Sequence, residues 1–380
     1  MAHSKPKGWL RAAGLVIRLL SAAVIVCLIF WIGLSVAGKF FTVGISEEDL
    51  LANHPAAVMI HDPSNSAWPM TVATVHGDVV VHERPGKAVA LTTDAADNLV
   101  ALELTPSGIP DLSAHTATGA AITPWLSEGL SIQKPELLEL EGDTLPYDQI
   151  ASLDPGAIFA TGSNLREDQF RTLSRIAPTI DVPVGNKQPA WEQSVQVVGT
   201  VMGAPKQVAR KLDETEHLLA NVRDEETSFR GTTTVIVDIS HQNSLMLRYG
   251  SSPTAQLLEA FGFTVVGAPT DDQEGFFTNT RPTTWEEITM LNPDLVVVFY
   301  ESDSQRAETE SNPIYATIPA VHGGHVVGLQ NADMIMALRH PTVLSIPWTV
   351  NTVVPLLRAG VVGRDAPAPE GPRPDLVPRL

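Results

Sequence analysis

Polar and apolar positions follow the same order in two separate segments of this chain. Residues 147–155 and 285–293 each start with an aromatic and an acidic residue, carry Ile and Leu three and six positions after the aromatic, and end in proline. Apolar residues at this spacing line one face of a helix, and the proline ends it. An unbroken apolar run follows each segment, at 157–160 and at 295–299, and predicts a buried strand. Each copy therefore predicts a helix that turns into a strand, as in a βαβ unit of an α/β fold.

The spacing between the two copies is constant along their length. Residues 147 and 285 differ by 138, and so do the prolines at 155 and 293. A repeat of about 140 residues is as long as a typical domain. We therefore predict two lobes of similar build, with a ligand in the cleft between them.

A polar segment with helical period, residues 205–222, lies between the copies and predicts the connection between the lobes. Pro205 is well tolerated in the first turn of such a helix, which would be about 27 Å long at about 1.5 Å per residue. The predicted organisation is a membrane anchor or signal segment (1–38), a tether (39–70), an N-terminal lobe (71–204), the connecting helix (205–222), a C-terminal lobe (231–362) and a disordered tail (363–380).

Three local expectations follow from finer patterns. Alternation from Met70 to His82 predicts a hairpin that turns at Gly77 and Asp78. Residues 240–252 are expected to form a loop. Residues 342–359 are expected to form one closing helix.

The first 38 residues differ in composition from the rest of the chain. Four basic residues precede an uncharged run, residues 19–38, which is long enough to span a bilayer. The basic flank predicts that the N-terminus stays inside and the body lies on the extracytoplasmic face. The length of the run favours an uncleaved transmembrane helix over a signal peptide cleaved after Ala37. A lipoprotein anchored through Cys27 is a third reading, but Ile25 and Val26 are too large for that motif.

Charge and cysteine content exclude several classes of protein. The chain has 25 Lys and Arg against 43 Asp and Glu, a net charge of −18, which argues against nucleic-acid binding. The single cysteine excludes a disulfide framework and a thiolate metal site. No metal site is predicted, since His241, His322 and His325 lack the spacing of metal ligands.

Several phrases in the sequence resemble one known family. They are Pro85-Gly86-Lys87-Ala88-Val89-Ala90-Leu91, Ala96-Asp97-Asn98-Leu99-Val100-Ala101-Leu102, Leu173-Ser174-Arg175-Ile176-Ala177-Pro178-Thr179 and Ile318-Pro319-Ala320-Val321-His322-Gly323-Gly324-His325-Val326-Val327. In this order and spacing, over about residues 71–360, the chain resembles the substrate-binding proteins of ABC importers for ferric siderophores, haem and cobalamin.

The resemblance implies two Rossmann-like lobes joined by a single long helix, with the ligand cleft between the lobes. It also implies that Asp148 and Glu286, at matched places in the two copies, dock on an ABC permease and its ATPase. The alternative for both acids is a solvated carboxylate near a helix N-terminus, where the helix dipole favours it. Two positions depart from the family, which usually has Gly where this chain has Glu103 and Asp where it has Gly156.

Candidate ligand-binding residues lie in segments that follow the predicted strands, because ligands of open α/β sheets bind beyond the carboxyl ends of the strands. Guanidinium groups suit the oxygens of an anionic iron chelate, Tyr and His can bind iron, and Trp can stack on an aromatic ligand. The candidates are Arg248, Tyr249, Arg339, His340, Tyr300 and Trp125. A solvated surface charge is the simpler reading of each Arg, and a packing role that of each aromatic.

The predicted function is capture of an iron chelate, a ferric siderophore or haem, for an ABC importer. No resident cofactor and no catalytic residue are expected, because the sequence has no G-x-S-x-G, H-E-x-x-H, P-loop or G-x-G-x-x-G motif. The alternative is a membrane-anchored envelope scaffold of the same fold, with a degenerate cleft, that acts through protein contacts. Ligand binding in the cleft distinguishes the two.

Overall fold

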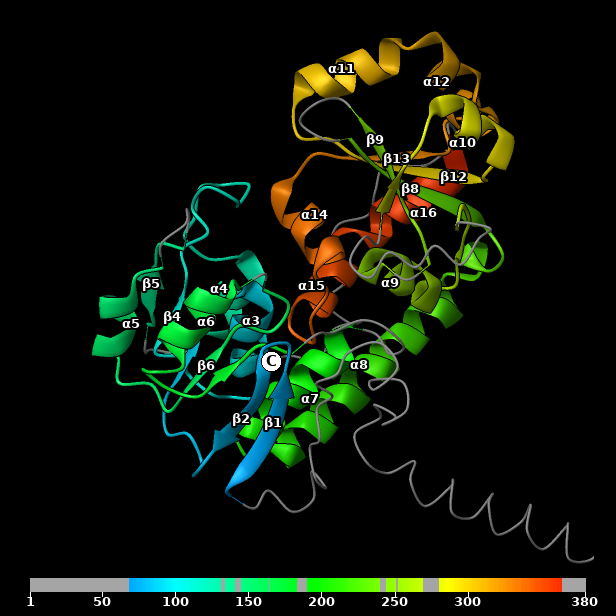
Figure 1. Ribbon diagram of the computed structural model, residues 1–380. Helices are drawn as coiled ribbons and strands as arrows, with labels where there is room; N and C mark the ends of the chain where they lie inside the picture. The colour runs from blue at the N-terminus through cyan, green and yellow to red at the C-terminus, as the bar shows by residue number, and fades with distance from the viewer. Residues whose placement is uncertain are drawn as a thin grey trace, which may run out of the picture.

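A computed structural model describes residues 68–130, 134–140, 145–163, 165–182, 190–239, 244–250, 252–268 and 280–363. Figure 1 shows two α/β lobes with helices packed around a sheet in each. The predicted anchor, nearly all of the tether and the tail after Gly363 lie outside the described residues. Among the helices that the structure describes, none is long and apolar enough to cross a membrane.

The N-terminal lobe contains a five-stranded parallel sheet in the order β5-β4-β3-β6-β7. Its central strands β3 and β6 are fully buried, which explains their apolar sequences. The strands are β3 (Ala88–Ala90), β4 (Gly108–Pro110), β5 (Glu136–Leu138), β6 (Ala157–Phe159) and β7 (Thr179–Ile180). The helices are α3 (Thr93–Ala101), α4 (Pro124–Gly129), α5 (Tyr147–Ser152), α6 (Glu167–Leu173) and α7 (Ala190–Val201).

The predicted hairpin is present as β1 (Met70–Thr74) and β2 (Gly77–Val81), but the predicted turn is wrong. Thr74 pairs with Gly77, so the turn residues are Val75 and His76. The Thr74 hydroxyl donates to the Gly77 carbonyl at 2.7 Å and accepts from the His76 backbone at 3.2 Å. These local hydrogen bonds close the turn two residues before the expected position.

The C-terminal lobe has a six-stranded mixed sheet, β11-β9-β8-β12-β13, with β10 also paired to β8. Strands β8, β10, β12 and β13 are parallel, whereas β9 and β11 are antiparallel to their neighbours. The strands are β8 (Thr233–Ile239), β9 (Leu245–Arg248), β10 (Thr264–Val265), β11 (Thr280–Pro282), β12 (Leu295–Phe299) and β13 (Val326–Leu329). The helices are α9 (Pro253–Phe261), α10 (Trp285–Leu291), α11 (Asp303–Ser311), α12 (Pro313–Thr317), α13 (Pro319–Gly323), α14 (Ala332–Arg339), α15 (Ser345–Thr352) and α16 (Val354–Val362).

Two local predictions for this lobe were wrong. The expected loop at 240–252 contains β9, whose Leu247 is buried against β8. The expected single helix at 342–359 is divided at Val353 into α15 and α16. Pro355, in the first turn of α16, has no backbone N–H to continue the hydrogen-bond ladder.

The repeat at an offset of 138 residues is confirmed in the backbone. Helices α5 and α10 lead into β6 and β12, which begin at residues 157 and 295. Asp154 and Asn292, at matched positions before the two prolines, both have left-handed backbone with φ of 51° and 46°. Glu103, where the family usually has Gly, is also left-handed, with φ of 63°, and its carboxylate lies 2.6 Å from Arg210 on the connecting helix.

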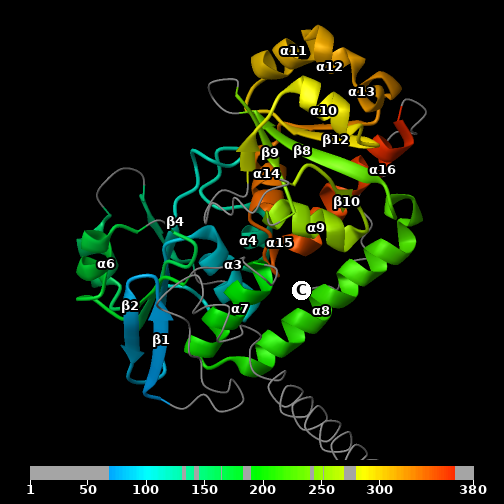
Figure 2. The ribbon, with the colours of Figure 1, turned by 45° about the vertical axis from the view of Figure 1, so that its right-hand side comes forward.

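The connecting helix α8 (Pro205–Glu225) has 21 residues and is longer than predicted at its C-terminal end. Figure 2 shows it running from the N-terminal lobe, beside α7, to the far end of the C-terminal lobe. A short 3₁₀ turn (Thr227–Phe229) follows it. Glu226, next to this turn, accepts hydrogen bonds from the Arg358 guanidinium on α16, which holds the end of α8 to the C-terminal lobe.

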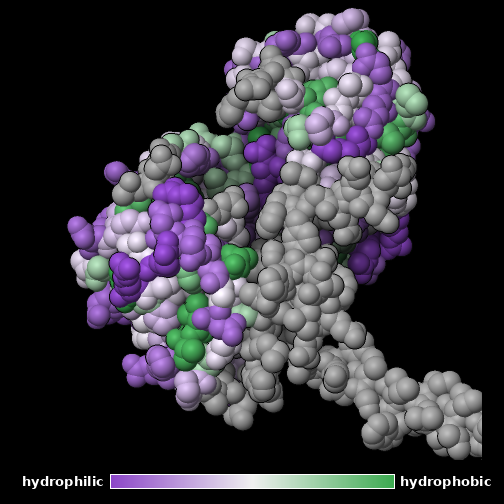
Figure 3. All heavy atoms as spheres, in the orientation of Figure 1, coloured by the Kyte–Doolittle hydropathy of each residue, from purple (hydrophilic) through white to green (hydrophobic). Residues whose placement is uncertain are grey.

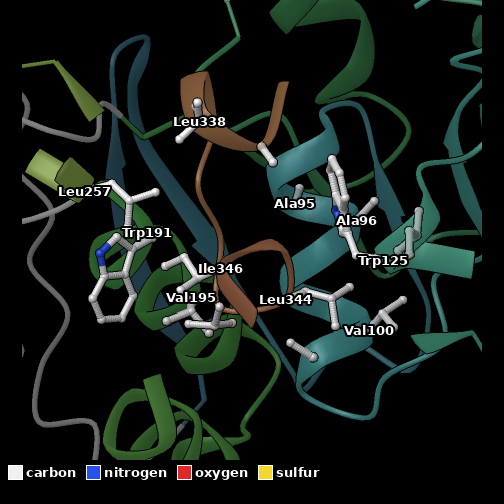
Figure 4. Close-up of a cluster of buried hydrophobic side chains, with 14 of the residues drawn as sticks. Ala95, Ala96, Val100, Trp125, Trp191, Val195, Leu257, Leu338, Leu344 and Ile346 are labelled. Carbon is white, nitrogen blue, oxygen red and sulfur yellow. The ribbon is translucent and has the colours of Figure 1, made fainter. Parts of the chain in front are cut away.

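The two lobes share a continuous apolar core at their base, so α8 is not their only connection. This core includes side chains of α3, α4 and α7 from the N-terminal lobe together with residues of α9, α14 and α15. Figure 4 shows Leu344 next to Val100 of α3, and Ile346 of α15 next to Val195 of α7. The segment from α14 to α15 therefore packs directly on the N-terminal lobe.

Candidate functional site

Each sheet has a point where the strand order reverses, and these points define the cleft. In the N-terminal lobe the chain leaves β3 toward β4 on one side and returns to β6 on the other. In the C-terminal lobe the same reversal falls between β8 and β12. Ligands of such sheets bind at the carboxyl ends of these strands. Figure 3 shows a notch between the two lobes, with hydrophilic residues along part of it.

A buried carboxylate lies at the C-terminal switch point and pairs with two of the predicted residues. Asp238, near the end of β8 and aligned with Phe299 of β12, is 7% exposed. Its Oδ2 is 2.6 Å from Nη2 of Arg248, and its Oδ1 accepts from Nη2 of Arg339 at 2.9 Å. Arg248 comes from β9 and Arg339 from the end of α14. We name Asp238, Arg248 and Arg339 the arginine cluster.

The arginine cluster carries more positive than negative charge. Two guanidinium groups share one carboxylate, which leaves a net charge of +1. Burial lowers the pKa of the Arg248 guanidinium, Asp238 opposes this decrease, and the nearby Arg339 charge adds to it. The Arg339 guanidinium also lies over the Phe299 ring, 5.6 Å from its centroid, a geometry that stabilises a cation.

Hydrogen-bonding capacity remains in both guanidinium groups. The Nε atoms of Arg248 and Arg339 are buried and have no hydrogen-bond partner among the described residues. A buried donor without a partner is costly, on the order of 1–3 kcal/mol. An anionic oxygen donated by a ligand would satisfy such donors through charge-assisted hydrogen bonds.

Two other predicted residues lie next to the arginine cluster in the chain. Tyr249 directly follows Arg248 and is half-buried. His340 directly follows Arg339, has a side chain 60% exposed, and places Nδ1 at 3.9 Å from Oδ1 of Asp94 on α3. His340 therefore bridges from the C-terminal lobe toward the N-terminal one.

Trp125 and Tyr300 lie away from the arginine cluster. Trp125 is 2% exposed, donates from Nε1 to Asp97 at 2.8 Å, and packs on Trp348 in the shared core. Tyr300 is 1% exposed and belongs to the apolar core on the other face of the C-terminal sheet, beside Tyr315. Burial raises the pKa of the Tyr300 phenol, which disfavours an iron-binding phenolate. Neither ring offers a surface to a ligand in this structure, so we exclude both from the candidate site.

The N-terminal side of the cleft offers neutral groups. Thr161 and Ser163 follow the carboxyl end of β6, and their hydroxyl oxygens are buried with no hydrogen-bond partner among the described residues. Thr92, at the end of β3, accepts from the Ala95 backbone and caps α3. Groups of three or more His, Cys, Asp or Glu that could hold a metal ion are absent from the part of the chain that the structure describes.

The predicted docking residues occupy matched and exposed places. Asp148 is in the first turn of α5 and Glu286 in the first turn of α10, and both are exposed. Neighbouring Glu287, by contrast, is held by Arg281 at 2.5 Å and by Thr283 at 2.8 Å. One exposed acid per lobe thus remains for a partner.

Asp238 was missed when the sequence was read. Its signal was an acidic residue near the end of the apolar run Val235-Ile236-Val237, which is unusual for a buried parallel strand. Only the pairing of β8 with β9 and the position of α14 show that two arginines compensate it.

Comparisons with known proteins agree with this architecture. A family model described as periplasmic binding protein matches residues 89–332, more than half of the chain. The chain therefore belongs to the periplasmic binding protein family. It is 23% identical to a putative ABC transporter substrate-binding lipoprotein, YhfQ, of Bacillus subtilis, over 69% of this chain and 81% of that protein. It is also 23% identical to the ferric enterobactin-binding periplasmic protein FepB of Escherichia coli, over 74% and 88%.

Solved structures show the same fold. The structure of PiaA from Streptococcus pneumoniae in complex with ferrichrome covers 75% of this chain and 96% of its own, with a TM-score of 0.65 and 19% identity. The two-lobed α/β architecture with a long connecting helix is thus the one predicted from the sequence.

Proposed function

We propose that this chain captures an anionic ferric siderophore between its lobes and delivers it to an ABC importer on the extracytoplasmic face of a membrane. The observation that carries the proposal is the arginine cluster, which places a net positive charge and unpaired donors at the C-terminal switch point. Ferric catecholates and ferric citrate present several anionic oxygens, which guanidinium groups bind well. Two relatives are named as an importer's binding lipoprotein and as a ferric enterobactin-binding protein, which supports this ligand class.

The remaining parts of the proposal concern delivery. Residues 19–38 would hold the protein at the membrane, since their length and apolar character suit a bilayer span. Asp148 and Glu286 would pair with basic residues of the permease, one on each lobe. Family membership favours this function over an envelope scaffold with a degenerate cleft.

The proposal is tested by titrating the full-length chain with ferric catecholate, ferric citrate, ferric hydroxamate, haem and cobalamin while following tryptophan fluorescence. Saturable binding of an anionic ferric chelate is expected. Arg248→Met should weaken that binding by about 10- to 100-fold, because a hydrogen bond to a charged group contributes about 1.5–3 kcal/mol.

Arg306→Met is the matched control. Arg306 belongs to the same lobe but lies over the Tyr300 ring, 5.7 Å from its centroid, and pairs with Glu310. Its replacement should leave the affinity unchanged. Absence of binding across the whole panel would contradict the proposed function, and unchanged affinity in Arg248→Met would remove the arginine cluster from the site.

A further inference from the structure

One carboxyl group is buried at the place where the C-terminal lobe meets α3. Asp97, in the middle of α3, is 0% exposed. Its Oδ2 accepts two hydrogen bonds of 2.8 Å, one from Trp125 Nε1 and one from the Thr342 hydroxyl. Its Oδ1 is buried and has no hydrogen-bond partner among the described residues. The carboxyl group therefore ties α3 and α4 to the segment that joins α14 and α15.

Thr342 is the residue through which Asp97 acts on the C-terminal lobe. Its backbone N–H donates to the Ser345 hydroxyl and its own hydroxyl accepts from the Ser345 backbone, both at 2.9 Å. This reciprocal pair has the pattern of a capping box at the start of α15. Asp97 thus holds the first turn of a helix that packs between the lobes (Figure 4).

The surroundings of Asp97 offer no positive charge in contact with it. The groups that face it from α4 and from the α15 segment, Trp125 and Thr342, are neutral donors. On the α7 side, Asn98 pairs with Ser194 at 2.7 Å, and both are neutral.

The nearest charged groups lie one turn away or further along the interface. Asp94 precedes Asp97 on α3 and faces His340 at 3.9 Å. Asp333, in the first turn of α14, is 3% exposed and accepts a hydrogen bond from the Ala117 backbone of the N-terminal lobe. All three carboxyl groups at this interface have a raised pKa, and burial is the largest cause in each.

Asp97 has the clearest shift of the three. Burial raises its pKa to about 8, the hydrogen bonds from Thr342 and Trp125 oppose the increase, and the Asp94 charge adds to it. An ionised carboxylate in this apolar environment would be relieved only if water reached it.

We propose that Asp97 is a positioning residue at the pivot of the two lobes, which carries a proton in the arrangement seen here and loses it when the lobes separate. The neutral carboxyl accepts from Thr342 and holds α15 on the N-terminal lobe. Separation of the lobes admits water and allows Asp97 to ionise. Lobe opening is then coupled to release of one proton from Oδ1 to solvent.

The direction of the pH dependence follows from the raised pKa. A solvated Asp has a pKa of 3.8, and Asp97 in the present arrangement has one of about 8. The preference for this arrangement is therefore full below the lower value, decreases as the pH rises between the two, and is lost above the higher one. The inference concerns the movement of the lobes alone, and its test needs no ligand, so it stands or fails separately from the proposed function.

The test measures the distance between the lobes by electron spin resonance on the full-length chain with Cys27→Ser. Spin labels are attached at Ser152→Cys on α5 and Ser304→Cys on α11, both exposed and one in each lobe. Between about pH 5 and pH 9 the distribution in the otherwise unchanged chain should shift to longer distances. Asp97→Asn retains an acceptor for both donors but cannot ionise, so it should keep the short distance at both pH values.

Thr342→Val supplies a second variant that does not alter Asp97 itself. It removes the hydroxyl link to α15 and should give the longer distance already at about pH 5. An unchanged distance in the parent chain, or an equal shift in Asp97→Asn, would overturn the proposal. So would a Thr342→Val chain with the parent's short distance at the lower pH.

Discussion

The two copies of the internal repeat share a backbone but differ at the strand ends that face the cleft. Ala88 pairs with Ala157 in the first sheet and Thr234 pairs with Leu295 in the second, so positions on β3 and β8 correspond at an offset of 146. Thr92 therefore corresponds to Asp238, since 92 plus 146 is 238. Thr92 makes a local cap on α3, whereas Asp238 binds two arginines from β9 and α14.

This difference assigns separate tasks to the lobes. The N-terminal switch point is neutral and held by hydrogen bonds within a few residues. The C-terminal switch point is charged and held by residues far apart in the chain. An anionic ligand would consequently be oriented by the C-terminal lobe, while the N-terminal lobe would close over it with neutral groups.

A second difference explains one of the departures from the family. Asp294 follows the proline of the second copy and accepts from the backbone and hydroxyl of Thr233, at 2.9 and 2.7 Å. The matched residue in the first copy is Gly156. A Cβ there would lie 3.0 Å from the Cα of Pro85, so the backbone leading from the entry hairpin occupies the space of a side chain.

The largest expected effect comes from reversing the charge of the matched acids. Asp148→Lys together with Glu286→Lys should abolish importer-dependent uptake of the bound chelate, because like charges would then meet at both docking contacts. The ligand affinity of the purified chain should not change. Uptake of the radioactive iron chelate by cells measures the first quantity, and fluorescence titration the second.

Single reversals sharpen the comparison between the lobes, since equal losses would mean equivalent docking contacts. Asp213→Lys, which reverses an acid with a side chain 74% exposed on α8, is the control and should transport normally. Normal uptake by the double variant would contradict the docking role.

A smaller effect is expected from the corresponding positions at the strand ends. Asp238→Asn leaves two unpaired guanidinium groups and should lower the free energy of unfolding by about 2–3 kcal/mol, less than for a fully buried pair because Arg339 is partly exposed. Thr92→Ala removes only a helix cap and should lower it by about 1 kcal/mol. Denaturant titration of both variants measures the difference.

The same variant separates stability from ligand binding. Asp238→Asn raises the charge of the arginine cluster, so the affinity for an anionic chelate should increase while the stability falls. A parallel loss of both would mean that Asp238 organises the site rather than merely neutralising it.

The smallest effect concerns the left-handed residues before the two prolines. Glycine adopts this conformation without strain, so Asp154→Gly should stabilise the chain by about 1 kcal/mol. Asn292→Gly should gain less, because asparagine tolerates left-handed backbone better than most residues. Thermal unfolding of the two variants compares them, and a larger gain at position 292 would contradict this account.

The sequence determined the repeat, both central strands, the connecting helix and the two exposed acids. Apolar period, proline position and the constant offset are local properties, and they carry most of the information about helices and buried strands. Local hydrogen bonds at Thr74 and the break before Pro355 were the details that periodicity did not reveal.

Only the tertiary structure decided which side chains meet. Asp238 and Arg339 are 101 residues apart, and Asp97 and Thr342 are 245 apart. The same aromatic residue types that suggested a ligand site, Trp125 and Tyr300, are packed inside the protein. Contacts of this kind depend on the register of strands and the packing of helices across the whole chain, and burial then determines whether a charge is paired, neutral or available to a ligand.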